Sequence, residues 1–458
     1  MSDRFSRFRQ LWSAILPRPA LSKNVLRLAT PVTLGMLTFT LLSIVDTAML
    51  GYLGSVPLAA SGIAGVLFFA IVFSISSMSV GTQSLVARRF GEGNEHHCGQ
   101  VLNTGLGLCL AFGISLVVAA PWIADAVAPL FSSDLQVREA GSVYLHYRLL
   151  GSLFMLLNSI SLGFFAGIGK TKHQLAGSIF ITVTNILLDY VLIFGHAGFP
   201  KLGVQGAAVA SSIALGVGTA YYMIVLTLPG YRTRYGAFRR PWFAAQWLRP
   251  MLRLSTPILA QRILGNGAWS IFFILVARIG TVELAASNVI RSIYNLSIMI
   301  AVGLGTASAA LLGQNLGANN PEKAEQLAWE SVKLATYAMI AIGILFLAAP
   351  GFVFRIYTTD AAVIGAGRLP LILLGLVQVF AGVALVLSQS LQGAGNTRYV
   401  MVAEFVCILL YLPTVYLLGL RTSLGLVGAW TGEYLYWIVL AFAMVWKFRT
   451  GSWKAIKL

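Results

Sequence analysis

The sequence predicts an all-α integral membrane protein with twelve transmembrane helices, arranged as two pseudo-symmetric six-helix bundles. The first observation behind this prediction is composition: 57% of the 458 residues are hydrophobic, only 10% are charged, and the mean hydropathy is +0.80. Soluble domains carry about 25% charged residues, so the chain falls outside that class. A helix needs about 20 apolar residues to cross a bilayer. Twelve segments meet this requirement: 25–50, 57–82, 100–124, 142–166, 173–194, 204–228, 252–277, 283–312, 329–354, 368–391, 398–420 and 424–447.

The second observation is an internal repeat. Three motifs of the first half recur in the second half, each 226 residues later. The pairs are LRLATP at 26–31 and LRLSTP at 252–257, LGSVPLAAS at 53–61 and IGTVELAAS at 279–287, and GIGKTK at 167–172 and GAGNTR at 393–398. A constant offset predicts two bundles built on one plan. Because six is an even number, both bundles cross the membrane in the same direction. Parallel repeats of this kind place the substrate path at the interface between the bundles.

The repeat divides the chain into five parts. They are a cytoplasmic leader at 1–24, an N-terminal lobe at 25–228, a cytoplasmic linker at 229–250, a C-terminal lobe at 251–447 and a cytoplasmic tail at 448–458. Since the loops between spans are short, we expect no separate soluble domain.

The positive charge supports this topology. Of the 32 Lys and Arg residues, 23 fall on one side of the twelve spans, 6 on the other and 3 within them, and the populated side includes Arg4, Arg7, Arg9 and Arg240. By the positive-inside rule, both termini are cytoplasmic. We therefore expect a protein of the plasma membrane, or of the inner membrane if the source is bacterial. The net charge of +17 is a topology signal with weak attraction to membrane lipid, and we expect no nucleic-acid partner.

Cysteine usage and catalytic motifs argue against an enzyme. Cys98, Cys109 and Cys407 are few, widely spaced and odd in number, so they indicate neither a disulfide framework nor a metal site. The GIGKT segment at 167–171 resembles a phosphate-binding loop, but Phe164 stands where that motif needs a glycine. We expect no enzymatic activity, no resident cofactor and no metal centre.

Two aspartates inside the predicted spans are the strongest candidates for function. Asp46 lies in the first span and Asp189 in the fifth, each roughly one to two helical turns from the outer end. Asn185 lies four residues before Asp189, on the same helix face. A carboxylate in hydrocarbon costs roughly 2.5–3.5 kcal/mol on insertion scales. Burial favours the neutral form, which predicts an ion or proton site; the alternative is a satisfied polar residue between packed helices.

Other residues within the spans leave alternatives open. Trp269 and Phe272 would suit the apolar wall of a substrate cavity, although aromatic residues at helical spacing also serve as packing. Glu433 could line the same cavity. For Glu404, which lies near the cytoplasmic end of its span, a structural pair or snorkelling is favoured. The sequence leaves open whether Arg148, Arg262 and Arg291 pair with acids, sit at helix ends or line the cavity.

Pro31 in the first span is a candidate hinge. Proline removes one backbone hydrogen bond and permits a bend. The alternative is a proline at the start of the helix. Pro31 shares its span with Asp46, so protonation of the acid could bias the bend.

Several motifs, taken in order, resemble the MATE (multidrug and toxic compound extrusion) transporters. They are VDTAMLGYLG at 45–54, LAASGI at 58–63, VGTQSLVARRFGEGN at 80–94, GIGKTK at 167–172 and NILLDYVLIFG at 185–195. The resemblance covers essentially the whole chain and is closest to the DinF-like branch. It implies a V-shaped pair of six-helix lobes that exports amphipathic, often cationic organic compounds in exchange for H+ or Na+.

The resemblance also implies roles for particular residues. Asp46 matches the acid of the family's first helix, Asp189 matches the fifth-helix acid of the DinF-like and archaeal branch, and Asn185 matches the companion of that acid. Tyr144 and Asn158 are the nearest matches to a tyrosine and an asparagine of the same network.

This sequence differs from the NorM-like branch of the family, and the difference indicates which ion is coupled to transport. That branch places the acids of its cation site on the seventh and tenth helices, and the segments 252–277 and 368–391 contain none. We therefore expect proton coupling through Asp46 and Asp189. Na+ bound by the same two residues is an alternative, because carboxylates and amide oxygens also suit a hard cation.

The expected partners are small amphipathic or cationic molecules and membrane lipid, and we expect a monomer. A second alternative within the same superfamily is a flippase for lipids or lipid-linked oligosaccharides. Arg148, Arg262 and Arg291 could supply the cationic cavity that such a substrate requires. The sign of the charge lining the central cleft would separate the two functions.

Overall fold

A computed structural model describes residues 16–131, 134–239 and 242–458 of the protein. Arg4, Arg7, Arg9, Arg240 and most of the predicted leader lie outside the described residues. Every regular element in the described ranges is a helix. In the first half these are α2 (Pro19–Gly51), α3 (Ser55–Phe68), η1 (Phe69–Phe73), α4 (Met78–Gly91), α5 (Glu95–Val127), η2 (Ala128–Leu130), α6 (Leu135–Leu150), α7 (Ser152–Gly167), α8 (Lys172–Phe194), α9 (Val204–Thr227) and α10 (Pro229–Tyr235). In the second half they are α11 (Ala245–Ala277), α12 (Thr281–Gly317), α13 (Pro321–Ala348), α14 (Pro350–Arg355), α15 (Ala361–Gly393), α16 (Thr397–Leu420), α17 (Gly425–Arg449) and η3 (Ser452–Ala455).

The helices confirm the predicted all-α membrane fold. Within the described residues, 11 helices are long and apolar enough to cross a membrane, and the number rises to 12 when the bent pair α6 and α7 is taken as one span. The two helices of this pair meet at 46°. The predicted fourth span, 142–166, is therefore a broken helix rather than a straight one.

The break in the fourth span lies at Gly151, where α9 approaches closely. A Cβ at this position would lie 2.6 Å from Ser212 Oγ, so only glycine lets α9 approach this closely. The Ser212 hydroxyl donates a hydrogen bond to the carbonyl of Tyr147 at 2.9 Å. The bend leaves the Tyr147 carbonyl without its usual hydrogen bond inside the helix, and the Ser212 hydroxyl takes the place of that donor.

The chain forms two compact units whose boundaries differ from the predicted lobes. Unit 1 comprises Met1–Thr33 and Ala260–Leu458, and unit 2 comprises Leu34–Leu259. The prediction placed the divisions near residues 25 and 251 instead. The long helices α2 and α11 therefore each begin in one unit and end in the other.

Long-range contacts explain these boundaries. The backbone N–H of Arg18 donates to Glu330 on α13 at 2.6 Å, which ties the start of α2 to unit 1. In unit 2, a Cβ on Gly81 of α4 would overlap Ser255 Oγ, so the first half of α11 packs closely against α4. No sequence periodicity encodes either contact.

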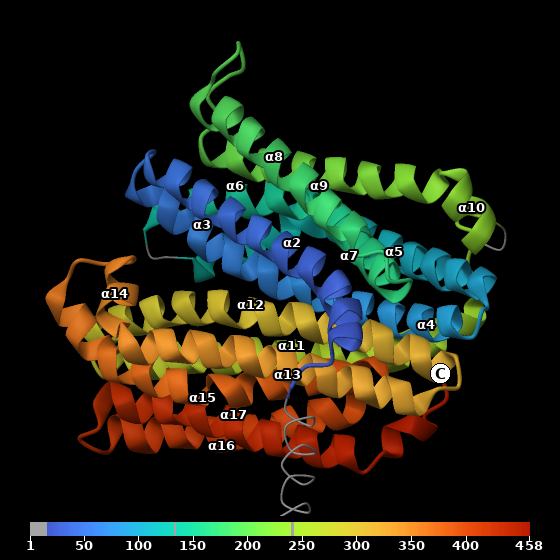
Figure 1. Ribbon diagram of the computed structural model, residues 1–458. Helices are drawn as coiled ribbons and strands as arrows, with labels where there is room; N and C mark the ends of the chain where they lie inside the picture. Colours follow the sequence, from blue (N-terminus) through green and yellow to red (C-terminus); the bar gives the residue numbers. More distant parts are fainter. Residues whose placement is uncertain (1–15, 132–133, 240–241) are drawn as a thin grey trace, which may run out of the picture. The chain divides into compact units, whose positions relative to one another are not determined.

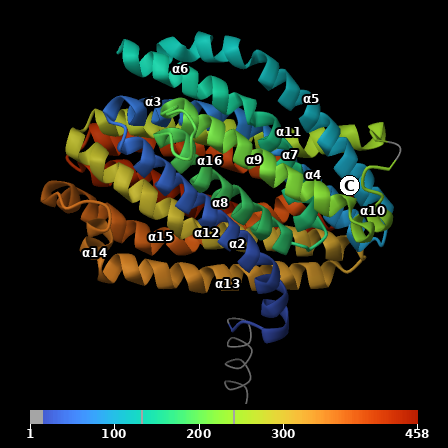
Figure 2. The same cartoon turned by 90° about the horizontal axis from the view of Figure 1, so that it is seen from above.

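Each unit has its own packing core. In unit 1, the helices α12, α13, α15, α16 and α17 lie side by side, and α15 contacts the other four (Figure 1). In unit 2, α8 packs against α9 (Figure 2), α7 packs against α4 and α5, and α6 bridges α3 and α9. The acid-bearing helix α8 therefore belongs to a packed bundle.

Candidate functional site

The two predicted acids come together inside unit 2. The carboxyl groups of Asp46 of α2 and Asp189 of α8 lie within hydrogen-bonding reach of each other. Asp189 has no exposed surface, and Asn185 Nδ2 donates to its Oδ2 at 3.2 Å. In the described part of the chain, the Oδ1 atoms of both aspartates are buried without a hydrogen-bond partner. The predicted grouping of Asp46, Asp189 and Asn185 in one place is therefore what the structure contains.

Close packing of α2 on α8 brings these acids to the same level. A Cβ on Gly35 would lie 3.0 Å from Ser178 Oγ, and the Thr182 hydroxyl donates to the Thr38 carbonyl at 3.4 Å. From that second contact Asp46 is eight residues further along α2, and Asp189 is seven residues further along α8. Because both helices rise by the same amount per residue, the two side chains reach nearly equal heights.

Arg148 is the charged neighbour of the acid pair. It acts electrostatically on both Asp46 and Asp189. Its guanidinium carbon lies 4.6 Å from the centroid of the Phe68 ring, and its Nη1 is buried without a partner among the described residues. Tyr144, one helical turn earlier on α6, is buried and forms a side-chain hydrogen bond with Arg148.

Sequence reasoning left the role of Arg148 open, although a signal existed. Arg148 follows Tyr144 by four residues, so the two side chains share a helix face. Because Tyr144 matched the family's network, that spacing placed Arg148 on the same side of the helix.

Asn158 has a different set of partners. Its Nδ2 donates to the Leu215 carbonyl at 3.0 Å, and its Oδ1 accepts from the Thr219 hydroxyl at 2.9 Å. Both ends of this amide thus bind α9 and hold it against α7. A role for Asn158 in ion coupling stays a prediction.

We expect Thr219→Val to destabilise unit 2. The substitution leaves the buried Asn158 Oδ1 without its donor, which costs about 1–3 kcal/mol. Thermal unfolding of the detergent-purified protein should show a lower midpoint than the wild type. Thr414→Val is the matched control, because the exposed Thr414 hydroxyl bonds Leu410 of its own helix. Equal midpoints for the two variants would contradict the bracing role.

The candidate cavity residues of unit 1 lie in an aromatic core. Phe272 has no exposed surface, and its ring centroid lies 5.6 Å from Trp269 and 5.3 Å from Trp430. The buried ring supports the packing alternative for Phe272 over the cavity wall. Glu433 is 4% exposed and accepts a hydrogen bond from Trp437 Nε1 at 2.8 Å.

Two further charged residues in the unit 1 spans, Glu404 and Arg291, also have partners. Gln261 donates through Nε2 to Glu404, and Gln392 Nε2 donates to Gln261 Oε1 at 3.1 Å. This chain of bonds agrees with the structural pair favoured for Glu404. The guanidinium carbon of Arg291 lies 4.7 Å from the centroid of the Phe273 ring. The described residues contain no group of three or more His, Cys, Asp and Glu side chains suited to a metal ion.

Pro31 lies inside α2, which begins at Pro19. It is therefore an interior proline, and the alternative of a helix-start proline is wrong. The boundary between the two units falls two residues later, after Thr33. The role of Pro31 as a hinge stays a prediction.

Comparison with known proteins identifies the family. A model of the MatE family matches residues 31–191 and 257–417, and these two segments are offset by the same amount as the paired sequence motifs, which confirms the internal repeat. The chain is 25% identical to the "Probable multidrug resistance protein NorM" of Thermotoga maritima, over 97% of this chain and 96% of that protein. It is 29% identical to the "Multidrug resistance protein NorM" of Burkholderia vietnamiensis, over 94% of this chain and 95% of that protein.

Solved structures share the fold. An outward-facing MATE multidrug resistance transporter of the MOP superfamily aligns with a TM-score of 0.87 and 22% identity, over 95% of this chain and 97% of that one. A MOP superfamily transporter from Pyrococcus furiosus, described as having a binding pocket of reverse polarity, also aligns with a TM-score of 0.87 and 22% identity, over 97% of this chain and 98% of that one. The membrane helices, the repeated family match and these relatives agree. The chain belongs to the MATE family of multidrug transporters, a family of integral membrane proteins and not of enzymes.

Proposed function

We propose that this transporter exports amphipathic, often cationic organic compounds by antiport, and that Asp46 and Asp189 bind the proton that drives it. The approach of the two carboxyl groups to within hydrogen-bonding reach carries this proposal. An ionised carboxylate has acceptors only, so a bond between two of them needs a proton on one. Such a pair takes up and releases one proton as a unit.

The neighbours of the pair support exchange rather than simple proton binding. When the proton leaves, the second negative charge is offset by Arg148 and by the Asn185 amide, which donates to Asp189 at 3.2 Å. A cationic substrate that reaches the pair would offset the same charge. Proton and substrate would then compete for one state of the site, which is the requirement for antiport.

The driving force depends on the charge of the substrate. One pH unit supplies about 1.36 kcal/mol per proton, which corresponds to a tenfold substrate gradient. For a neutral substrate, each inward proton gains a further free energy of about 2.3 kcal/mol per 100 mV of membrane potential. Exchange of one proton for one monovalent cation moves no net charge, so the pH gradient alone would drive it.

The remaining expectations belong to the same proposal. The protein resides in the bacterial inner membrane as a monomer. Both of its termini are cytoplasmic, because Lys and Arg are concentrated on that side of the predicted spans. Its relatives in Thermotoga and Burkholderia are bacterial. In this orientation the acid pair lies near the outer face.

Sodium coupling at the same site is the second candidate. The buried Oδ1 atoms of Asp46 and Asp189 have no hydrogen-bond partner in the described ranges, so two acceptors are available to a cation. Together with the Asn185 amide oxygen, they make an all-oxygen ligand set of the kind that hard cations take.

Purified protein in vesicles separates the two ions. With an imposed pH gradient and equal sodium on both sides, we expect a fluorescent organic cation to accumulate about tenfold per pH unit. With an imposed sodium gradient and equal pH, we expect no accumulation. Transport under sodium alone would overturn proton coupling and favour the second candidate. Absence of transport under both gradients, with substrate binding retained, would contradict the antiport proposal.

A further inference from the structure

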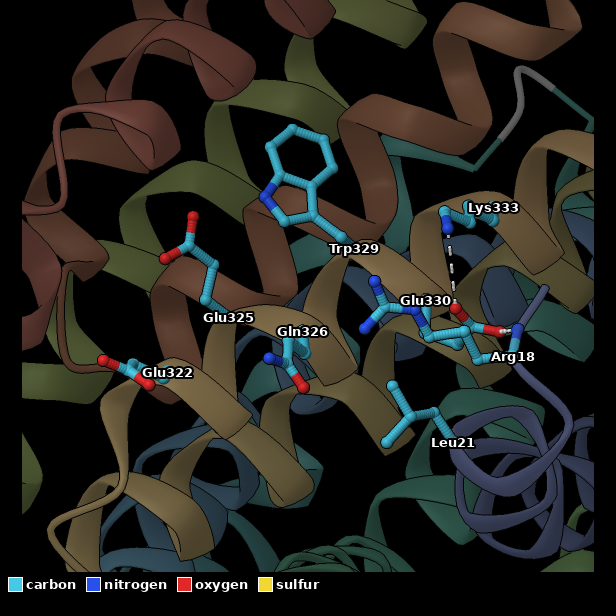
Figure 3. A pocket seen from close by; sticks show the side chains of 8 residues that line it. All are labelled: Arg18, Leu21, Glu322, Glu325, Gln326, Trp329, Glu330 and Lys333. Atoms are coloured by element: carbon cyan, nitrogen blue, oxygen red, sulfur yellow. Dashed lines mark hydrogen bonds and ion pairs between the residues drawn. The ribbon is translucent and has the colours of Figure 1, made fainter. Parts of the chain in front are cut away.

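The start of α2 is held by a buried charge in unit 1. Glu330 of α13 is 1% exposed, and its Oε1 accepts from the Arg18 backbone N–H at 2.6 Å and from the Ser22 hydroxyl at 2.5 Å. Lys333 Nζ lies 3.8 Å from Glu330 Oε2 and donates to the Leu16 carbonyl at 3.2 Å. Figure 3 shows Glu330 between Lys333 and the backbone of Arg18. We call these five residues the unit 1 clamp.

A cavity adjoins the unit 1 clamp. It measures about 470 Å³, and Leu21, Trp329 and Glu325 line it together with residues of the clamp (Figure 3). The first turn of α2 therefore borders open space on one side.

The chain at the start of α11 is also held in unit 2, here by hydrogen bonds to the uncharged side chains of Asn103 and Thr104. The Thr104 hydroxyl of α5 accepts from the Ala244 backbone N–H at 3.2 Å and lies 3.4 Å from the Ala244 carbonyl oxygen, to which it can donate. Asn103 Oδ1 accepts from the Phe238 N–H at 3.0 Å, and Asn103 Nδ2 donates to the Arg239 carbonyl at 3.3 Å. We call these five residues the unit 2 clamp.

The two clamps occupy equivalent places in the repeat. Glu330 lies 226 residues after Thr104, which is the offset of the repeat. The residues that they hold, Ala244 (by Thr104) and Arg18 (by Glu330), are also 226 residues apart. The unit boundaries, after Thr33 and after Leu259, are also 226 residues apart. Each boundary falls two residues after an interior proline, at position 31 in α2 and at position 257 in α11.

We propose that the clamps are a reciprocal mechanical linkage for the conformational step of transport. Each unit holds the start of a helix whose remainder belongs to the other unit. Because that start is held in place, bending of the helix near Pro31 or Pro257 changes the orientation of one unit relative to the other. The clamp residues are positioning residues, because they touch neither proton nor substrate. This inference goes beyond the proposed antiport and depends on it only where efflux is measured.

The two clamps differ in how they can be released. Bonds to an ionised group are stronger than neutral ones, and a buried charge that loses its partners is unfavourable. The unit 1 clamp should therefore open as a whole or stay closed. The neutral unit 2 clamp can loosen one bond at a time.

The unit 1 clamp is tested with two substitutions at Glu330. Glu330→Ala removes the acceptor for Arg18 and Ser22, and we expect amide hydrogen exchange in segment 16–24 to rise about tenfold or more. We expect efflux in vesicles to fall by about the same factor, since bending of α2 is no longer transmitted. Glu330→Gln keeps an acceptor oxygen but loses the charge that strengthens these bonds, so its exchange and efflux should lie between those of Glu330→Ala and the wild type. This partial rescue would not occur if the negative charge alone mattered.

Glu325→Ala is the matched control on the same helix. Glu325 pairs with Lys454 at 2.5 Å and lies outside the clamp. We expect this variant to leave both exchange in 16–24 and efflux within about twofold of the wild type. If Glu330→Ala shows faster amide exchange in segment 16–24 but wild-type efflux, the linkage is overturned, whether or not the antiport proposal holds. Unchanged exchange in Glu330→Ala would show that there is no clamp.

The reciprocal half of the proposal has its own test, which also serves if Glu330→Ala does not fold. Thr104→Val removes the hydroxyl that binds Ala244 but keeps the shape of the side chain. We expect exchange to rise in segments 238–239 and 242–247 and not in 16–24, with a several-fold loss of efflux. If exchange rises and efflux is unchanged, the unit 2 contacts are not a linkage.

Discussion

Asp46→Asn is expected to abolish proton-driven efflux while the protein still folds and reaches the membrane. The amide has nearly the same shape as the carboxyl group and can donate to Asp189, so the packing of α2 on α8 is retained. It cannot bind and release a proton, so the pair becomes a fixed single charge. A pH gradient of one unit should then produce no accumulation, where the wild type accumulates about tenfold.

The control for Asp46→Asn is its exposed neighbour on α2. The Thr47 hydroxyl bonds the Ser43 carbonyl of its own helix at 2.7 Å. Thr47→Ala should keep efflux within about twofold, because a surface change of this kind alters stability by less than about 0.5 kcal/mol. Wild-type efflux by Asp46→Asn would contradict coupling through the acid pair.

Asp189→Asn should be nearly as harmful, and for a related reason. Asp189 is fully buried and holds both Asn185 and Asp46. An asparagine here can accept from Asn185 and donate to Asp46, which keeps Asp46 ionised. Proton-driven accumulation of a fluorescent cation in vesicles should fall to background.

A second substitution separates coupling from folding at this position. Asp189→Ala leaves the buried Asn185 amide without its acceptor, at a cost of about 1–3 kcal/mol. Its thermal midpoint should therefore drop, whereas that of Asp189→Asn should stay near the wild type. Tyr190→Phe is the control, since Tyr190 is 52% exposed on the same helix. Residual proton-driven transport by Asp189→Asn would assign the coupling to Asp46 alone.

Much of this architecture was predictable because it follows from local composition and from the repeat. Apolar segments of about 20 residues define the spans, and motif pairs at a constant offset define two equivalent halves. The acid pair could also be expected. Asp46 and Asp189 are charged residues within apolar segments at the same depth, and such residues face a protein interior or a cavity.

The break in the fourth span could not be predicted in this way. Gly151 lies in an ordinary apolar segment, and its bend depends on Ser212, which belongs to a different helix, α9. The role of Arg148 was open for a similar reason. Its helix face is a local property, but the approach of that face to Asp46 and Asp189 depends on how three helices pack.

The sequence alone establishes that this chain crosses the membrane many times, repeats one plan twice and carries two acids where hydrocarbon would otherwise lie. Hydropathy and periodicity are sums over neighbouring residues, so they can be read without coordinates. Folding in three dimensions establishes which side chains meet those acids, and that α2 and α11 each start in one unit and finish in the other. Those outcomes depend on contacts such as Arg18 with Glu330, 312 residues apart, and no local pattern records a partner at that distance.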